Sequence, residues 1–403
     1  MKKIQLHWQI LIALILAVFF GIYFKEHVHY IAWMGEVFLR ALKMIIVPLI
    51  FTSIVSGITN IGNSKNLGRL GFKTILYYIS TSFLAIITGL VLVNIFKPGV
   101  GADLNLESAI DLKVTPDTLG DTLIRIVPDN VFSAFSQNTQ MLSVIFFALL
   151  FGFFITRINK KPQVLLTDVI NGIFEVMMKV TMFIIKFTPF GIFGLVAEKV
   201  AEQDNLIALV QSMGLYMGVV LMALAVHAFI TLPLIAKYVG KINPLKNFHA
   251  VKTPLITAFS TSSSSATLPL TLEAVETKAG VSNKISSFTL PLGATINMDG
   301  TALYECVATM FIAQAYGIDM SIGQQIIIVI TAILASIGAA GVPMAGLVMI
   351  TIILTAVGLP LEGVGLILAV DRILDMFRTA VNVWSDTTGA AVIAKSEGEI
   401  LKI

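Results

Sequence analysis

The chain has 403 residues, of which 56% are apolar and only 13% are charged, and its mean hydropathy is +0.89. Soluble domains carry roughly 25% charged residues, so this composition excludes an ordinary soluble protein and predicts a polytopic membrane protein. The net charge of +3 is small and spread over loops, which argues against a nucleic-acid partner, and the single cysteine, Cys306, excludes an internal disulfide.

Six apolar segments come first, and each approaches or exceeds the roughly 20 residues that a helix needs to cross hydrocarbon. They are residues 8–24, 37–58, 72–96, 131–155, 169–196 and 206–238. The first follows Lys2 and Lys3 but lacks a small-residue cleavage site, so we expect a retained helix rather than a signal peptide.

Two later apolar segments, residues 244–276 and 321–358, are interrupted by small or helix-breaking residues at 260–269 and 338–343. Lys and Arg gather at residues 65–73, 157–161 and 237–252, which by the positive-inside rule predicts that both termini are cytoplasmic. With eight full spans, each interrupted segment must then enter and leave on one side, from opposite faces. The sequence therefore predicts an all-α polytopic membrane protein, with eight transmembrane helices and two re-entrant helical hairpins in an inverted repeat. In the alternative, the small residues only allow close helix packing.

The seventh expected span, residues 287–316, contains Asn297, Asp299 and Gly300 in its middle. The first two are costly in lipid and Gly300 weakens a helix, so we expect a broken helix that presents carbonyls and a carboxylate to a cation. Hard oxygen ligands suit such an ion. A kink sealed by Asn and Thr side chains is the alternative interpretation.

The eighth expected span, residues 366–394, carries a polar face in an apolar helix. Its residues recur at helical spacing: Asp371, Asp375, Arg378, Asn382 and Asp386. Each uncompensated charge near the bilayer centre costs about 3 kcal/mol or more, so this face must line a site.

These motifs resemble the glutamate/aspartate:cation symporter family, which includes archaeal aspartate transporters and animal excitatory amino acid transporters. The resemblance is carried by Ser260 to Pro269, Asn297 to Thr301, residues 336–343 and Arg378 to Asp386. It implies a non-enzymatic secondary transporter in the cell membrane that imports acidic amino acids with sodium by elevator-type alternating access. It also implies a homotrimer, a scaffold of residues 1–60 and 126–200, and a transport unit of residues 68–96, 206–240 and 244–396.

The resemblance also implies roles for single residues. Arg378 would pair with the substrate's side-chain carboxylate and Asp375 with its amino group. An arginine fork suits a carboxylate on independent chemical grounds. The other implied substrate residues are Thr301, Asn382, Thr379, Ser263, Ser264 and the backbone near Val342 and Gly346.

Sodium would be the coupling ion, with no other cofactor. One implied site uses the backbone of Gly293, Asn297 and Asn382 with the Asp386 carboxylate. A second uses the backbone of Thr295, Ser336, Ile337 and Ala339, and a third uses Tyr78, Thr81 and Ser82 with Asn297 and Asp299. Without the resemblance, the trio on the third span is more typical of polar groups that pack between helices.

Four further positions bear on coupling and gating. Glu305 is a lone carboxylate that can take up a proton at that depth, and proton- and potassium-coupled family members have Glu there; a structural acid is the alternative. Ser262 and Met376 stand where family members carry a second arginine. Arg372 lies beside the polar face, where it partners Asp371 or Asp375 or only packs.

Other classes of function remain open on sequence. Asp299 with Asp386 can be imagined as an aspartyl protease pair, although the flanking residues suit cation ligation better. A serine protease needs a base, yet all five histidines lie outside the serine-rich tip. A channel, a proton-coupled dicarboxylate transporter and a neutral amino acid transporter are further alternatives. Cleavage of a reporter would reveal a protease, and current without saturable substrate dependence would reveal a channel.

Overall fold

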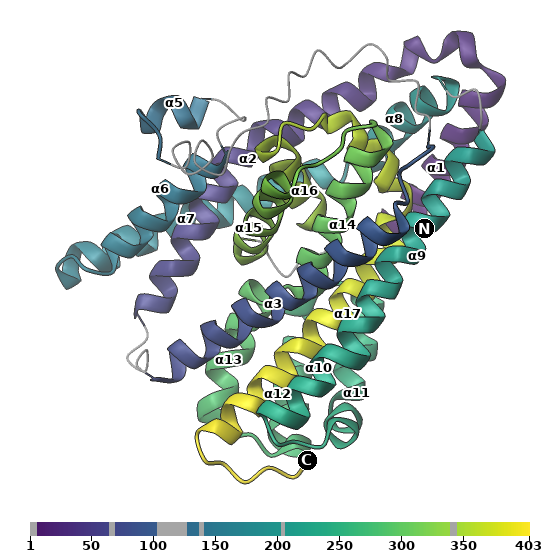
Figure 1. Cartoon of the computed structure of the whole chain (residues 1–403). Coiled ribbons are helices and arrows are strands. Elements are labelled where there is room, and N and C mark those ends of the chain that lie inside the picture. The colour runs from purple at the N-terminus through teal and green to yellow at the C-terminus, as the bar shows by residue number, and fades with distance from the viewer. Residues whose placement is uncertain (1–5, 64–68, 103–126, 137–140, 203–205, 339–344) are drawn as a thin grey trace, which may run out of the picture.

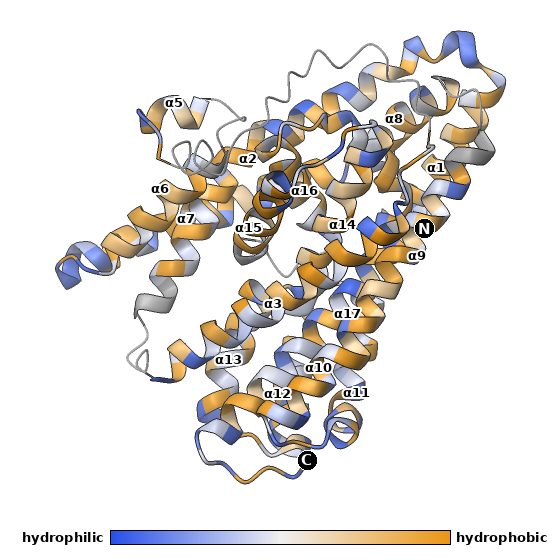
Figure 2. Ribbon diagram, in the orientation of Figure 1, coloured by the Kyte–Doolittle hydropathy of each residue, from blue (hydrophilic) through white to orange (hydrophobic). Residues whose placement is uncertain are grey.

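A computed structural model describes residues 6–63, 69–102, 127–136, 141–202, 206–338 and 345–403. Every regular element in these ranges is a helix, which confirms the all-α prediction (Figure 1). Apolar residues make up much of the helical ribbon, and hydrophilic residues gather at several helix ends and loops, among them the loop near the C-terminus (Figure 2).

The first group of helices packs around α2 (His29–Asn63). Helix α2 contacts α6 (Met141–Ile155), α7 (Lys160–Ile185) and α8 (Thr188–Glu202), and α1 (Leu6–Tyr23) lies against α8. Two glycines allow α2 and α8 to touch, because a Cβ on Gly194 would lie 2.6 Å from the Gly35 amide nitrogen. The short elements η1 (Lys25–His27) and α5 (Val131–Ser136) complete this group.

The second group contains α3 (Arg69–Phe96) and α9 (Leu206–Val226), which contact each other and the C-terminal helix. Helix α9 continues through two π-helical turns, η3 (His227–Thr231) and η4 (Ile235–Val239), on either side of α10 (Leu232–Leu234). A π turn holds more residues than an α turn, so it changes which side chains face the neighbouring helices.

The first interrupted segment forms two paired helices, α11 (Pro244–Thr261) and α12 (Ser264–Ala274), followed by the π turn η5 (Val275–Ala279). The chain reverses at Ser262, which has a left-handed φ of +51°, and the Ser263 hydroxyl accepts a hydrogen bond from the Ala266 amide at 3.2 Å. The second interrupted segment likewise pairs α15 (Ile322–Gly338) with α16 (Ala345–Ala356), and residues 339–344 of its tip lie outside the described ranges.

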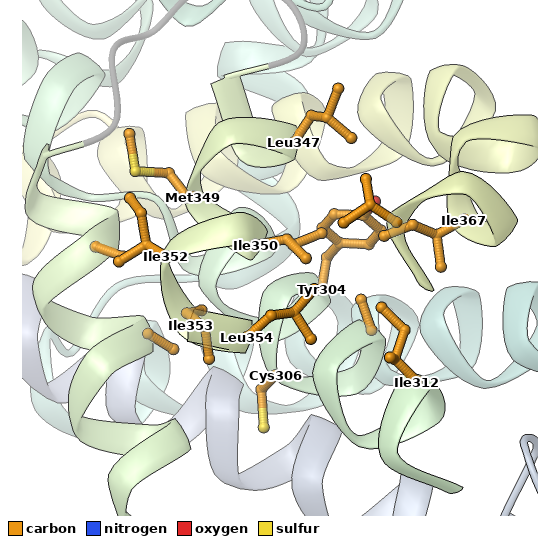
Figure 3. Packing of buried hydrophobic residues seen from close by; sticks show 14 of the residues in the cluster. Tyr304, Cys306, Ile312, Leu347, Met349, Ile350, Ile352, Ile353, Leu354 and Ile367 are labelled. Carbon is orange, nitrogen blue, oxygen red and sulfur yellow. The ribbon is translucent and has the colours of Figure 1, made fainter. Parts of the chain in front are cut away.

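The predicted break in the seventh span is confirmed, because α13 (Asn283–Ile296) ends and α14 (Asp299–Ala315) begins around Asn297 and Met298. After η6 (Leu361–Gly363), the final helix α17 (Val364–Ser396) runs beside α9, α11, α13 and α14 (Figure 1). The Tyr304 ring of α14 lies among apolar side chains that include Ile350 of α16 and Ile367 of α17 (Figure 3). This packing fixes α17 against the broken helix.

By length and apolarity alone, three helices of the described chain qualify as membrane spans: His29–Thr59, Arg69–Phe96 and Val210–Val239. Lys160–Ile185 and Thr188–Glu198, bent by 52°, make a fourth if they are counted together. Shorter apolar helices cover Trp8–Tyr23, Ser143–Ile155 and Ile322–Ser336. Eight spans with two re-entrant hairpins therefore stay a prediction.

Candidate functional site

Arg378 of α17 is fully buried and held by two carboxylates of its own helix. Its Nη2 lies 2.8 Å from Asp375 Oδ1 and 3.1 Å from Asp371 Oδ1. The Tyr304 ring covers the guanidinium, with its centroid 3.8 Å from Cζ, and the Tyr304 hydroxyl donates to Asp371 Oδ1 at 2.7 Å. Ion pairs and a cation–π contact thus compensate the buried charge from one side.

The other side of the Arg378 guanidinium is unused, because Nε and Nη1 have no hydrogen-bond partner within the described residues. A Cβ on Gly346 of α16 would lie 3.0 Å from Nη1 and 3.3 Å from the Thr301 side chain. Glycine at 346 therefore leaves room beside the guanidinium. A buried donor without a partner costs about 1–3 kcal/mol, so two such donors point to a bound acceptor.

Asn382 joins α17 to the start of α14. Its Oδ1 accepts a hydrogen bond from the Gly300 amide at 2.7 Å, and its Nδ2 donates to Thr301 Oγ1 at 3.1 Å. A Cβ on Gly300 would lie 2.7 Å from the Arg378 carbonyl oxygen, so the close approach requires glycine. The break in the seventh span is thus locked to the polar face of α17.

Asp299 is fully buried and receives four side-chain contacts. Its Oδ1 accepts hydrogen bonds from Ser82 Oγ at 2.6 Å and Thr81 Oγ1 at 3.2 Å. Its Oδ2 accepts one from Ser385 Oγ at 2.6 Å and lies 3.1 Å from His227 Nε2. The predicted cluster of Thr81, Ser82 and Asp299 is therefore brought together.

Two members of this cluster were missed from the sequence. Ser385 adjoins Asp386, so its place on α17 was a usable signal. His227 gives no such signal, because it is a lone histidine in an apolar helix. The π turn that begins at His227 contributes to its orientation toward α14.

The second carboxylate, Asp386, lies next to this cluster. Asn297 Nδ2 donates to Asp386 Oδ1 at 2.8 Å and to Ser385 Oγ at 3.0 Å. Gly293 faces the Asp386 carboxylate, and a Cβ there would lie 2.7 Å from the Tyr78 hydroxyl. The Tyr78 hydroxyl donates to the Thr289 carbonyl at 2.7 Å, so it lies beside Gly293. The result is a buried set of oxygen atoms around two carboxylates.

The second expected cation site would use backbone atoms of Thr295, Ser336, Ile337 and Ala339, and it stays a prediction. Helices α13 and α15 touch, and Thr295 Oγ1, on an exposed side chain, donates to Leu292 O of its own helix at 3.0 Å. Ser336 is buried in α15 and donates to the Ile333 carbonyl at 2.8 Å. Ala339 and Val342 lie outside the described residues, as does the Ile337 side chain.

The serine-rich tip lies beside α17, where the Phe259 and Phe377 rings meet edge to face at 5.0 Å. Ser264 is buried at the start of α12. Thr379 Oγ1 donates to the Asp375 carbonyl of its own helix at 2.8 Å. Binding roles for Ser263, Ser264 and Thr379 stay predictions.

Glu305 of α14 is fully buried, and neither carboxylate oxygen has a hydrogen-bond partner within the described part of the chain. Keeping such a group ionised is costly, because burial removes water and no partner replaces it. Glu305 lies one residue after Tyr304, which covers Arg378. This acid is therefore adjacent to the arginine site, with no hydrogen bond to it in the described part of the chain.

Comparison with known proteins identifies the family of the chain. Residues 6–396 match the model of the Sodium:dicarboxylate symporter family. The chain is 38% identical to the Excitatory amino acid transporter 3 of Mus musculus, over 96% of this chain and 85% of that protein. It is 38% identical to the Proton/sodium-glutamate symport protein of Bacillus caldotenax, over 99% and 96% of the two chains. It is 36% identical to the Proton/glutamate-aspartate symporter of Escherichia coli (strain K12), over 98% and 93%. The chain belongs to the sodium:dicarboxylate symporter family.

Proposed function

We propose that this protein imports acidic amino acids together with sodium by alternating access. The observation that carries the proposal is the buried guanidinium of Arg378, which has two donors without a partner in the described chain and lies 2.8 Å from Asp375. A dicarboxylic amino acid offers a carboxylate to the arginine fork and an ammonium to the aspartate. The names of the relatives, which specify glutamate or aspartate symport, support the same substrate class.

In this proposal, Arg378 binds the side-chain carboxylate of the substrate and Asp375 its amino group. Thr301 would also meet the side-chain carboxylate, and Asn382 and Ser264 would hold the main carboxylate together with the backbone near Val342 and Gly346. Ser263 and Thr379 would be further substrate-binding residues. The Asn382 side chain contacts Gly300 and Thr301, one residue and two residues beyond Asp299. Substrate at Arg378 and a cation at Asp299 would therefore both act on the conformation of the same segment at the start of α14. Coupled binding of two ligands requires such a shared element.

Sodium would bind at the carboxylate clusters. Around Asp299, one ion would be bound by the hydroxyls of Thr81 and Ser82 and by the amide oxygen of Asn297. A hydroxyl that donates a hydrogen bond to the carboxylate when no ion is bound can rotate and offer a lone pair to the ion. Around Asp386, the backbone of Gly293, Asn297 and Asn382 adds further oxygens. A further site at the second tip would use the backbone of Thr295, Ser336, Ile337 and Ala339, and Tyr78 would belong to the site around Asp299.

Glu305 would carry a proton inward with the substrate, and its ionised form would favour the empty return step, with internal potassium as a further coupled ion. The transport unit would comprise residues 68–96, 206–240 and 244–396, moving against a scaffold of residues 1–60 and 126–200. The protein would work as a homotrimer with both termini in the cytoplasm.

Uptake into proteoliposomes tests this proposal, with sodium, proton and potassium gradients imposed separately. We expect saturable aspartate or glutamate uptake that an inward sodium gradient drives. Saturable uptake of neutral amino acids with no competition by aspartate would overturn the substrate class. Aspartate uptake that a proton gradient alone drives to the same extent would overturn sodium coupling, and current without saturable substrate dependence would indicate a channel.

A further inference from the structure

The carboxylate of Asp375 faces two different arginines. Its Oδ1 lies 2.8 Å from Arg378 Nη2, and its Oδ2 lies 3.4 Å from Arg372 Nη1. The two arginines differ in burial, since the side chain of Arg378 is 0% exposed and that of Arg372 is 23% exposed. Arg378 is therefore a fixed partner, whereas Arg372 makes a longer contact from a side chain that its neighbours do not fully enclose.

The charges of this group explain why a second cation is needed. Arg378 contacts both Asp371 and Asp375, and its single positive charge balances only one of the two negative charges when both carboxylates are ionised. A buried carboxylate that lacks a compensating cation is destabilised. Arg372 supplies that cation on α17 while no ligand ammonium lies at Asp375.

We propose that Arg372 is a displaceable cation that caps Asp375 in the empty site and gives way to the ammonium of the substrate. This inference rests on the proposed function, because it takes Asp375 as the partner of the amino group. Arg372 is then a positioning residue that sets how strongly the site prefers an amino-bearing dicarboxylate over the same dicarboxylate without the amino group. Its guanidinium competes with the substrate, so removing it strengthens aspartate binding.

A role in general electrostatics gives a different result. If Arg372 only raised the local positive potential, its loss would weaken binding of every anionic ligand, including aspartate. If it only packed its apolar stem beside α17, substitution by Met would leave both ligands unchanged. Only displacement predicts tighter aspartate binding without tighter binding of succinate, which has no amino group.

The test compares sodium-dependent binding of aspartate and succinate to the purified full-length protein in wild type, Arg372→Gln, Arg372→Met and Arg372→Lys. We expect Arg372→Gln and Arg372→Met to lower the aspartate Kd by about 1.5-fold to fivefold, the range set by a partly exposed ion pair, without lowering the Kd of succinate measured by competition. Arg372→Lys retains the charge and should stay close to wild type. Arg40→Gln on α2, where an exposed arginine pairs with Glu36, is the matched control and should change neither ligand.

The possible outcomes distinguish failure of the proposed Arg372 role from failure of the proposed function. An unchanged or weaker aspartate affinity in both Arg372→Gln and Arg372→Met, with sodium-dependent aspartate binding intact in the wild type, overturns the role of Arg372 alone. Equal tightening of aspartate and succinate also overturns it. Absence of sodium-dependent aspartate binding by the wild type overturns the proposed function, and this inference falls with it.

Discussion

Replacing Arg378 by cysteine is the most direct perturbation of the candidate substrate site. The variant removes the two guanidinium donors that lack a partner in the described chain, at a position that is fully buried. Hydrogen bonds to charged groups contribute about 1.5–3 kcal/mol each, so two of them correspond to about 3–6 kcal/mol. At about 1.4 kcal/mol per tenfold, the aspartate Kd should rise by more than about 100-fold.

The same change should spare ligands that have no side-chain carboxylate. Serine and alanine still present an ammonium to Asp375 and a main carboxylate to the rest of the site, so their binding to Arg378→Cys should persist. Loss of Arg378 also leaves Asp371 and Asp375 without their shared cation, so a lower unfolding temperature is expected. Retained serine or alanine binding then distinguishes a lost specificity from a lost fold.

The assay is sodium-dependent ligand binding to purified protein, with size-exclusion and thermal unfolding profiles recorded on the same samples. Arg40→Cys provides the matched control, because the Arg40 side chain is 76% exposed on α2 and pairs with Glu36 of the same helix. If a folded Arg378→Cys protein binds aspartate with undiminished affinity, Arg378 does not bind the side-chain carboxylate of an acidic substrate.

Four further predictions follow from the same geometry. Asp299→Asn and Asp386→Asn each remove a negatively charged ligand of sodium, so the sodium concentration for half-maximal substrate binding should rise steeply. By linkage, substrate should then raise the sodium affinity less than it does in the wild type. Substrate binding by the wild type that does not depend on sodium would contradict this. His227→Ala removes the contact 3.1 Å from Asp299 Oδ2 and should raise that sodium concentration less than Asp299→Asn does, whereas an unchanged sodium dependence would show that His227 only packs. Glu305→Gln should abolish the pH dependence of net uptake but spare sodium-driven exchange of internal for external substrate. If the wild-type uptake rate is constant from about pH 5.5 to about 8.5 and does not respond to internal potassium, Glu305 is a structural acid only. Beyond the end of α17, hydrogen bonds from Arg69 and Lys73 lower the pKa of Glu397 to about 2. These contacts therefore stabilise the folded protein above the ordinary Glu pKa near 4.5, and this stabilisation is lost as the pH falls toward 2. The thermal unfolding temperatures of wild type and Glu397→Gln should converge at low pH, and a difference that stays constant with pH would contradict this role of Glu397.

The sequence by itself determined the parts of the site that depend on local rules. Helical spacing placed the five polar residues from Asp371 to Asp386 on one face, and the cost of charge in lipid required that face to be buried. Asn297 and Gly300 in an apolar span predicted the break that the structure has between α13 and α14. The serine-rich tip predicted the chain reversal at Ser262. Each inference used residues close together in the chain, where spacing and propensity carry the information.

Only the tertiary structure decided which partners these groups have. His227 meets Asp299 across 72 residues of sequence, Ser385 meets it across 86, and Tyr304 meets Asp371 across 67. Periodicity gives the face of a helix but not the helix that packs against it, and the π turn at His227 changes the face further. Helical periodicity likewise left Arg372 with two possible partners, Asp371 and Asp375, and the structure places it beside Asp375. Ion pairs between nearby positions of one helix differ by only a few tenths of a kcal/mol, so the surrounding packing selects between them.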